Sequence, residues 1–400
     1  MRARMSLESR RELLASQWSR YRHASRREKA MILDEFCHGT GYNRDYAVTL
    51  LNRPLPQRST KAVPRKRKRT YTAETQRALE QLWKVSGGLC GKRLVAGIPD
   101  YVEALERSAV WLYSEATRKQ VLRVSAATAD RLLAPARRGQ QPVGLSTTRP
   151  GSLLKHHIPI RTFADWNEDT AGFTEADLVA HCGETVAGEY INTLNLTDIK
   201  TGWTEPVALP NKGQEAVSCA IEKVRKRLPF ALLGLDTDNG KEFINDTLLR
   251  YCEKETITFS RGRPYKKNDQ CFVEQKNFSV IRKAIGYNRL EGDACCHILN
   301  RYYELLRLYV NFFQPSMKLV RKARTGSKVE KRYDKPRTPY RRVLDCPEVP
   351  QWLKDRLTNQ FERLNPIDLQ EQMEPLKAEL RKTAKLRFEN EATITAHLDS

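Results

Sequence analysis

Three acidic residues stand in surroundings that are unusual for a carboxylate. Asp177 lies inside an apolar, β-branched run, where a charge needs a partner or a metal ion. Asp238 closes a second such run, and the sharp turn predicted at Asn239 and Gly240 lets its carboxylate emerge at the edge of a sheet. Glu274 lies early in a predicted helix that follows a loop. Sixty residues separate the first two acids, and thirty-five separate the second from the third.

Such a set of ligands favours one kind of chemistry. Three carboxylates with no Cys or His among them select a hard cation, Mg²⁺ or Mn²⁺, which keeps some of its waters and binds substrate phosphate. We therefore predict a site for two metal ions about 4 Å apart, one activating a water or a 3′-hydroxyl and the other stabilising the leaving oxygen. The reaction would be in-line displacement at phosphorus without a covalent nucleophile.

The segments that carry these acids are typical of an α/β layer with a mixed sheet. Apolar runs predict three consecutive strands, a helix, a fourth strand, a helix and a short fifth strand. The runs are ADLVAHC, YINTLNLTDI, TEPVAL, QEAVSCAIEKVRKR, FALLGLD, KEFINDTLLRYCEKE and ITFS. After the loop RGRPYKKND, a helix is expected from about Gln270 to Ala284. The first and fourth strands can be neighbours in such a sheet, so the three acids could meet in one cleft.

Helical units precede this layer. Residues 27 to 52 predict two short helices around the turn from Gly39 to Gly41, with Asn43 capping the second. This pattern fits a helix-turn-helix and also an ordinary helical hairpin. Residues 71 to 135 predict a second helical unit, in which Ser125 caps a possible recognition helix. Between them, the run PRKRKR (residues 64–69) reads as a solvated basic linker.

These patterns divide the chain into six parts. The predicted parts are a helix-turn-helix domain (1–57), a basic linker (58–70), a second helical DNA-binding domain (71–135), a linker (136–163), a catalytic core (164–316) and a basic, mostly helical C-terminal region (317–400).

The composition agrees with a nucleic-acid partner. Lys and Arg number 70 against 48 Asp and Glu, a net charge of +22, which favours a polyanion. Ribosomal proteins and proteins of anionic membranes share such a balance. No apolar run is long enough for a signal peptide or a membrane span, and the nine cysteines show no C-x-x-C spacing. We expect a cytoplasmic bacterial protein associated with the nucleoid.

Other residues could assist the three acids. Asp236 shares a strand face with Asp238 and is predicted to lie just behind the metal ligands. His181 could approach the same site, although its pattern favours a packed or surface histidine. Asp198 is expected to shape a turn. The predicted DNA contacts are Lys266, Lys267, Asn268, Lys276, Asn277, Arg282, Arg65, Lys66, Arg67, Lys68 and Arg69.

The motifs LLGLDTDNGKEFIN and RPYKKNDQCFVEQKN resemble those of the DDE transposase and retroviral integrase superfamily. The resemblance covers about residues 170 to 315 and includes NFFQP, which resembles the end of the catalytic domain in bacterial insertion-sequence transposases. It implies a ribonuclease H-like fold and metal-ligand roles for Asp177, Asp238 and Glu274. The N-terminus lacks the paired His and Cys of the retroviral zinc module, so the bacterial enzymes are the closer match.

The resemblance implies a transposase or integrase that cuts element ends and transfers the 3′-hydroxyl into target DNA. It implies two Mg²⁺ or Mn²⁺ ions as cofactors, double-stranded DNA as partner, a homo-oligomer on DNA and no membrane. Two alternatives stay open at this point. One is a ribonuclease H-like endonuclease that does not join strands, and the other is a transposon-derived DNA-binding regulator.

Overall fold

The computed structural model describes residues 5–55, 70–137, 170–262, 271–325 and 328–398. The chain forms two compact units, Met1–Arg69 and Thr70–Ser400. No helix within the described ranges has the length and apolar character that crossing a bilayer requires.

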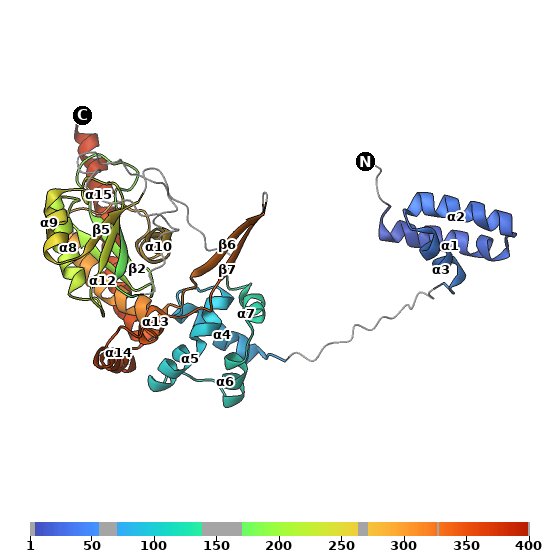
Figure 1. The fold of residues 1–400 in the computed structure, drawn as a ribbon, viewed down its shortest axis with the longest axis horizontal. Helices are drawn as coiled ribbons and strands as arrows, with labels where there is room; N and C mark the ends of the chain where they lie inside the picture. Colours follow the sequence, from blue (N-terminus) through green and yellow to red (C-terminus); the bar gives the residue numbers. More distant parts are fainter. Residues whose placement is uncertain (1–4, 56–69, 138–169, 263–270, 326–327, 399–400) are drawn as a thin grey trace. The chain divides into compact units, whose positions relative to one another are not determined.

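The first unit consists of three helices, which are α1 (Leu7–His23), α2 (Arg26–Thr40) and α3 (Arg44–Asn52) (Figure 1). Ser25 and Glu28 form a capping box at the start of α2, and Gly41 ends that helix at a φ of 71°. Asn43 caps α3 by accepting the N–H of Tyr46. The two helices predicted around the glycine turn are therefore confirmed, and α1 is an addition. Their buried core consists of Tyr21, Ile32, Leu33, Phe36, Ala47 and Leu51.

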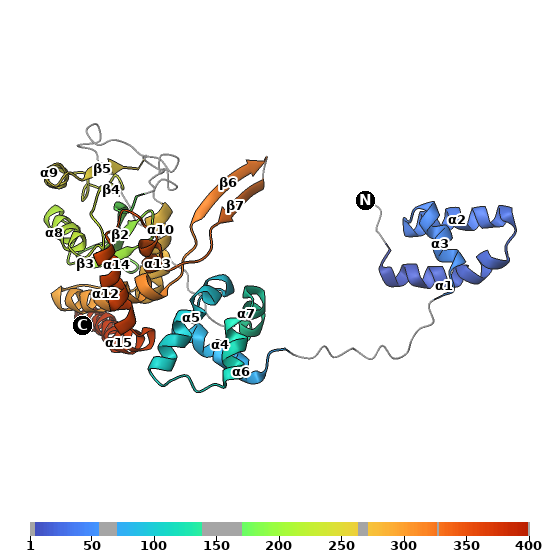
Figure 2. The same ribbon diagram turned by 60° about the horizontal axis from the view of Figure 1, so that its bottom comes forward.

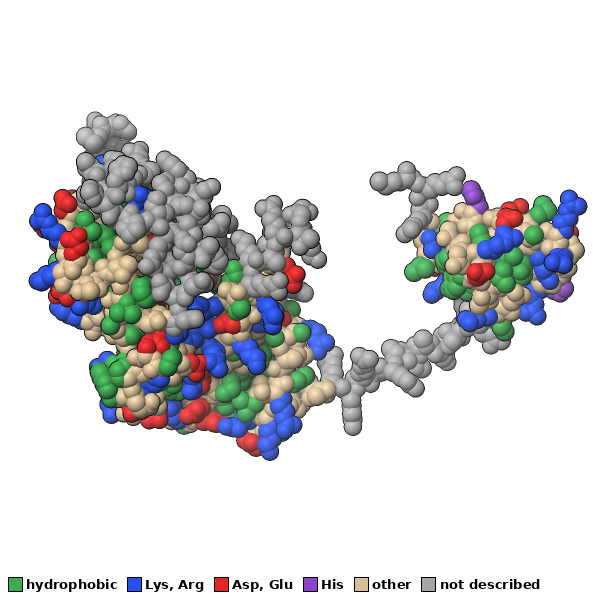
Figure 3. All heavy atoms as spheres, in the orientation of Figure 1, with side chains coloured by type: hydrophobic (Ala, Val, Ile, Leu, Met, Phe, Trp, Pro, Cys, Tyr) green, Lys and Arg blue, Asp and Glu red, His purple; other side chains and the backbone are tan. Residues whose placement is uncertain are grey.

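Four helices open the second unit: α4 (Ala73–Val85), α5 (Gly91–Arg107), α6 (Glu115–Leu122) and α7 (Ala126–Leu133). Ser125 caps α7 as predicted, accepting the N–H of Thr128. Buried tyrosines join these helices to the rest of the unit, since Tyr101 donates to the Phe313 carbonyl and Tyr309 donates to the Val85 carbonyl at 2.6 Å. Figure 3 shows Lys and Arg side chains gathered over α4 to α7.

A mixed sheet forms the centre of the second unit. Its strands are β1 (Phe173–Ala180), β2 (Asn192–Asp198), β3 (Thr204–Leu209), β4 (Gly234–Thr237) and β5 (Thr258–Arg261). Their order is β3-β2-β1-β4-β5, with β1 antiparallel to β2 and parallel to β4. The predicted five-stranded mixed sheet with helices is confirmed, including the adjacency of the first and fourth strands, and it is consistent with a ribonuclease H-like core.

Helices cover both faces of this sheet (Figures 1 and 2). Those around it are α8 (Gln214–Arg225), α9 (Asp246–Lys254), α10 (Cys271–Lys276), η3 (Asn277–Arg282), α11 (Lys283–Ile285) and α12 (Asp293–Phe313). Helices α8 and α9 pack together, α10 packs on β1 and β2, and α12 packs along β3. The single helix predicted from Gln270 to Ala284 contains a π-helical turn, η3, a distortion that often marks functional sites.

Buried polar contacts fix α12 to the edge of the sheet. The guanidinium of Arg307 donates to both oxygens of the fully buried Glu205, at 2.5 and 2.7 Å. The Asn311 side chain exchanges hydrogen bonds with the backbone of Thr204. These contacts hold β3 in place and so support the register of β2 and β1.

The C-terminal region contains β6 (Leu319–Thr325), β7 (Lys328–Tyr333), α13 (Pro339–Leu344), α14 (Gln351–Arg363) and α15 (Pro366–Leu398). Its predicted helical character is wrong for β6 and β7, which pair as an antiparallel two-stranded sheet. Leu residues at helical spacing in the last part of the region guided that prediction, and the basic segment from Lys318 to Arg342, which contains β6 and β7, lies before them. The three helices agree with it, and α15 packs along α12.

Candidate active site

Four carboxylates lie on one face of the adjacent parallel strands β1 and β4. Glu175 is paired in register with Asp236, and the next pair, Ala176 with Thr237, ends the ladder. One further step in the same register places Asp177 beside Asp238. Because side chains alternate along a strand, residues two apart share a face, so both pairs point the same way.

The pKa values of Asp177 and Asp238 are both raised, and the neighbouring acids contribute to the shift at Asp177. Burial first, and then the neighbouring carboxylate of Asp238, raise the pKa of Asp177 from 3.8 to about 7, and Glu274 contributes in the same direction. Burial raises the pKa of Asp238 from 3.8 to about 6. A nearby positive charge would favour both ionised forms.

Glu175 tethers the helix that carries the third acid. Its side chain is fully buried, and one carboxylate oxygen accepts the backbone N–H groups of Phe272 and Val273 at 2.9 and 2.8 Å. These residues open α10, so the contact fixes the start of the helix over β1. Glu274 follows directly and is exposed. Burial, with contributions from Asp236 and Glu274, raises the pKa of Glu175 well above its usual range.

Asn277 forms a second link between the helix and the strands. Its amide nitrogen donates to Asp177 at 2.7 Å, and its amide oxygen accepts from the side chain of Asn195 on β2 at 2.7 Å. Asn195 is the register partner of Asp177. The first turn of η3 is therefore fastened to β1 and β2, directly beside the acids.

Hydrogen-bond donors of the protein already bind the carboxylates of Asp177 and Asp238. The backbone N–H of Leu178 and the amide of Asn277 bind the two oxygens of Asp177, and the N–H of Gly240 binds Asp238 at 2.9 Å. Among the residues that the structure describes, no three His, Cys, Asp or Glu side chains are arranged so that they could hold a metal ion. The donor set is nevertheless the all-oxygen type that suits Mg²⁺ or Mn²⁺.

The assisting residues lie deeper in the fold. Asp236 is buried and accepts a hydrogen bond from Ser260 at 2.7 Å. The buried ring of His181 bonds Thr193 at 2.8 Å, and Thr193 bonds the Tyr303 hydroxyl, which places His181 in a packed chain of polar groups. Asp198 accepts two bonds from Thr201 and one from the Gly172 N–H, so its predicted turn-shaping role is confirmed.

Three of the predicted DNA contacts are either buried in the protein or hydrogen-bonded to other protein groups. Lys276 is 9% exposed, and burial lowers its pKa to about 7, with Arg93 and Arg342 adding to the effect. Arg282 donates to the Ala180 carbonyl at 2.9 Å and stacks over the Tyr287 ring. Asn277 binds Asp177, as described above. The other predicted contacts lie outside the described residues; they are Lys266, Lys267, Asn268, Arg65, Lys66, Arg67, Lys68 and Arg69.

Sequence reasoning missed Glu175 and the role of Asn277. Glu175 had a visible signal, because it is a second acid in the strand that carries Asp177, two positions earlier. The strand pattern alone could have placed it on the same face. The Asn277 contact depends on how η3 is wound, and no local pattern in the sequence indicates a π-helical turn.

Comparisons with known proteins add a relative and a weak structural likeness. No family model matches the chain. The catalytic core domain of BIV integrase is 18% identical, with a TM-score of 0.30, and the match covers 44% of this chain and 94% of that one. So low a score supports no inference. The uncharacterized protein y4rM of Sinorhizobium fredii is 41% identical over 352 residues, which cover 87% of this chain and 98% of that protein. The chain therefore belongs to the same family as y4rM.

Proposed function

We propose that this protein is a DDE-type polynucleotidyl transferase, a transposase or integrase that cuts DNA at element ends and joins the freed 3′-hydroxyl to target DNA. One observation carries the proposal. Asp177 and Asp238 occupy matching positions on neighbouring parallel strands, and the helix bearing Glu274 is tethered to the same strand face through Glu175. The motifs around these acids, which resemble those of this superfamily, support the same conclusion.

The acids would act by holding divalent cations against the DNA backbone. Asp177, Asp238 and Glu274 would be the ligands, and the bound ions would activate the attacking oxygen and stabilise the leaving one. Asp236 and Glu175 lie behind them on the same face, where Glu175 would hold the start of α10 in place. Asn277 would keep Asp177 oriented toward the site.

The helical units would bind the DNA. Three residues join α2 to α3 and three join α6 to α7, a spacing typical of helix-turn-helix motifs. On α3, Tyr46 and Thr49 are exposed and would face a DNA groove, whereas Arg44 is paired with Asp34 of α2. The net charge of +22 supports binding to phosphates. Because an element has two ends, at least two protomers would act together.

The test is a cleavage and joining assay on the DNA that flanks the gene, with Mg²⁺ and with EDTA. We expect nicked and joined products from the native protein, and none from Asp177→Asn, Asp238→Asn or Glu274→Gln. Glu253→Gln, on the exposed face of α9, is the matched control and should retain activity. Cutting without joining of pre-cleaved ends would instead identify an endonuclease. Full cleavage by the Asp238→Asn protein would rule out the proposed triad.

A further inference from the structure

A cavity of about 560 Å³ lies on the side of α10 and η3 that faces α12 and α15. The ends of α4 and α5 contribute to its wall as well. Five cationic side chains line it, Lys84, Arg93, Lys276, Lys283 and Lys377, against two carboxylates, Glu371 and Glu374. The lining therefore carries an excess of positive charge. The volume of the cavity is typical of a ligand-binding site.

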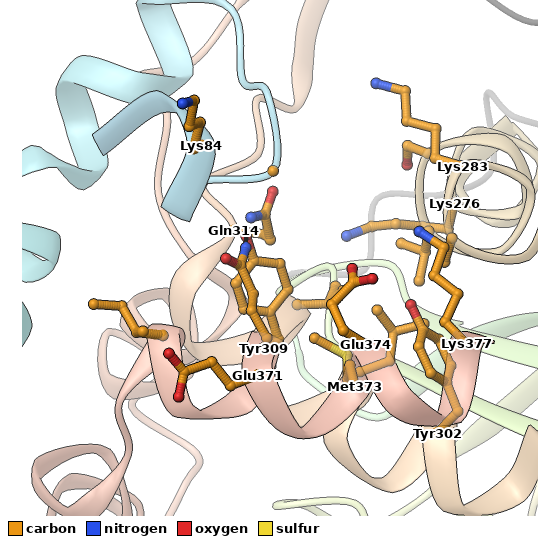
Figure 4. Close-up of a pocket in the computed structure, with 18 of the residues that line it drawn as sticks. Lys84, Lys276, Lys283, Tyr302, Tyr309, Gln314, Glu371, Met373, Glu374 and Lys377 are labelled. Carbon is orange, nitrogen blue, oxygen red and sulfur yellow. Dashed lines mark hydrogen bonds between the residues drawn. The ribbon is translucent and has the colours of Figure 1, made fainter. Parts of the chain in front are cut away.

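Lys276 is the most unusual group in this cavity. It is 9% exposed, and Figure 4 shows its amine directed from the helix into the cavity. Within the described parts of the chain, no hydrogen bond or ion pair is found for this amine, and neither Glu371 nor Glu374 lies within ion-pair distance of it. A buried cation without a counter-charge is costly, so an anion in the cavity would relieve that cost.

Three neutral polar side chains of the lining are hydrogen-bonded within the protein. The hydroxyl of Tyr309 donates to the Val85 carbonyl and binds the amide of Gln370 at 2.8 Å. The amide of Gln314 donates to the Ser86 carbonyl at 2.8 Å. These contacts hold the wall in a fixed shape around the buried Lys276 amine.

The rest of the lining suits a planar, partly apolar group. The rings of Tyr302 and Tyr309 line the cavity together with the apolar side chains of Val280, Leu306 and Met373. A phosphate alone would fill only a small part of the volume, whereas a nucleotide could place its phosphate near Lys276 and its base against the rings.

We propose that this cavity, here called the lysine pocket, binds a nucleotide through its phosphate, with Lys276 as the central cation. The phosphate could belong to a strand of DNA or to a free nucleotide. The proposal goes beyond the polynucleotidyl transferase activity and does not depend on it, because neither the three acids nor Asn277 lines the pocket.

The experiment is calorimetric titration of the full chain with the dinucleotide pdTpdT, in EDTA and about 0.3 M salt, where non-specific phosphate contacts are weakened. We expect saturable binding that inorganic phosphate competes away. Lys276→Met should weaken it at least tenfold and Lys276→Arg should preserve most of it. Lys212→Met removes an equal charge from an exposed position before α8 and should have no effect.

The outcomes separate this proposal from the proposed enzymatic function. The Asp238→Asn protein should bind pdTpdT like the native chain, because the triad is not involved. Tighter binding of a longer strand than of dTMP would identify DNA as the source of the phosphate, and equal binding would identify a free nucleotide. Absence of binding, or binding that Lys276→Met leaves unchanged in a folded protein, would overturn the proposal whether or not the protein cuts DNA.

Discussion

The contact between Glu175 and the start of α10 allows the loss of stability in a Glu175 variant to be predicted. Replacing Glu175 by Ala removes the acceptor for the N–H groups of Phe272 and Val273. Leaving buried donors unpaired costs about 1–3 kcal/mol each. Relief of the unfavourable burial of this carboxyl beside Asp236 offsets part of that loss. We therefore expect Glu175→Ala to lower the free energy of unfolding by about 2–3 kcal/mol.

The matched variant is Glu175→Gln, which keeps an oxygen that can accept both bonds. It should stay within about 1 kcal/mol of the native protein, since both hydrogen bonds to α10 can be kept. Urea unfolding measures both stabilities, and hydrogen exchange of residues 271–276 reports on α10 itself. We expect faster exchange at Phe272 and Val273 in the Ala variant alone. Native-like exchange in Glu175→Ala, or equal damage in Glu175→Gln, would refute the tethering role.

Three further predictions concern the acids, the Asn277 link and the ion pair that fixes α12 to the sheet. The raised pKa values of Asp177 and Asp238 mean that the folded state binds more protons than the unfolded chain between pH 4 and 7, so the stability of the metal-free protein should fall as pH rises through that window. Thermal melts should show this fall, and the fall should be smaller in the Asp177→Asn/Asp238→Asn double variant, in which only Glu175 and other buried acids still have raised pKa values. Asn277→Ala should cost about 1 kcal/mol in urea unfolding, through its lost bonds to the strands; an unchanged midpoint would contradict these contacts. Arg307→Met should cost about 3–5 kcal/mol by leaving Glu205 buried and unpaired, and adding Glu205→Leu should recover much of the loss. A further loss in the double variant would show that the ion pair contributes beyond charge compensation.

The sequence predicts the sheet well because its signals are local. Apolar runs such as YINTLNLTDI and turn residues such as Asn239 and Gly240 determine strands and their ends. The adjacency of β1 and β4, and hence of Asp177 and Asp238, follows from the α/β pattern. The capping residues Ser125 and Asn43 were equally readable, since a cap needs only one side chain and the next turn of helix.

What was missed depends on contacts between distant segments. Glu175 acts across nearly a hundred residues of chain, by binding amides whose position is set by tertiary packing. The lysine pocket exists only because α4, α5, η3, α12 and α15 meet, and in the sequence Lys276 looks like one more surface lysine. The β6–β7 pair lies in a charged segment in which the alternation of apolar and polar residues is too weak to favour a strand over a helix.

Binding of hard cations between β1 and β4 is the central claim, and anomalous diffraction from crystals grown with Mn²⁺ and element-end DNA would test it most directly. We expect manganese peaks within coordination distance of the Asp177 and Asp238 carboxylates, with Glu274 completing the ligands of one ion. Manganese bound elsewhere in crystals whose protein cuts DNA, with no peak beside Asp177 or Asp238, would contradict it.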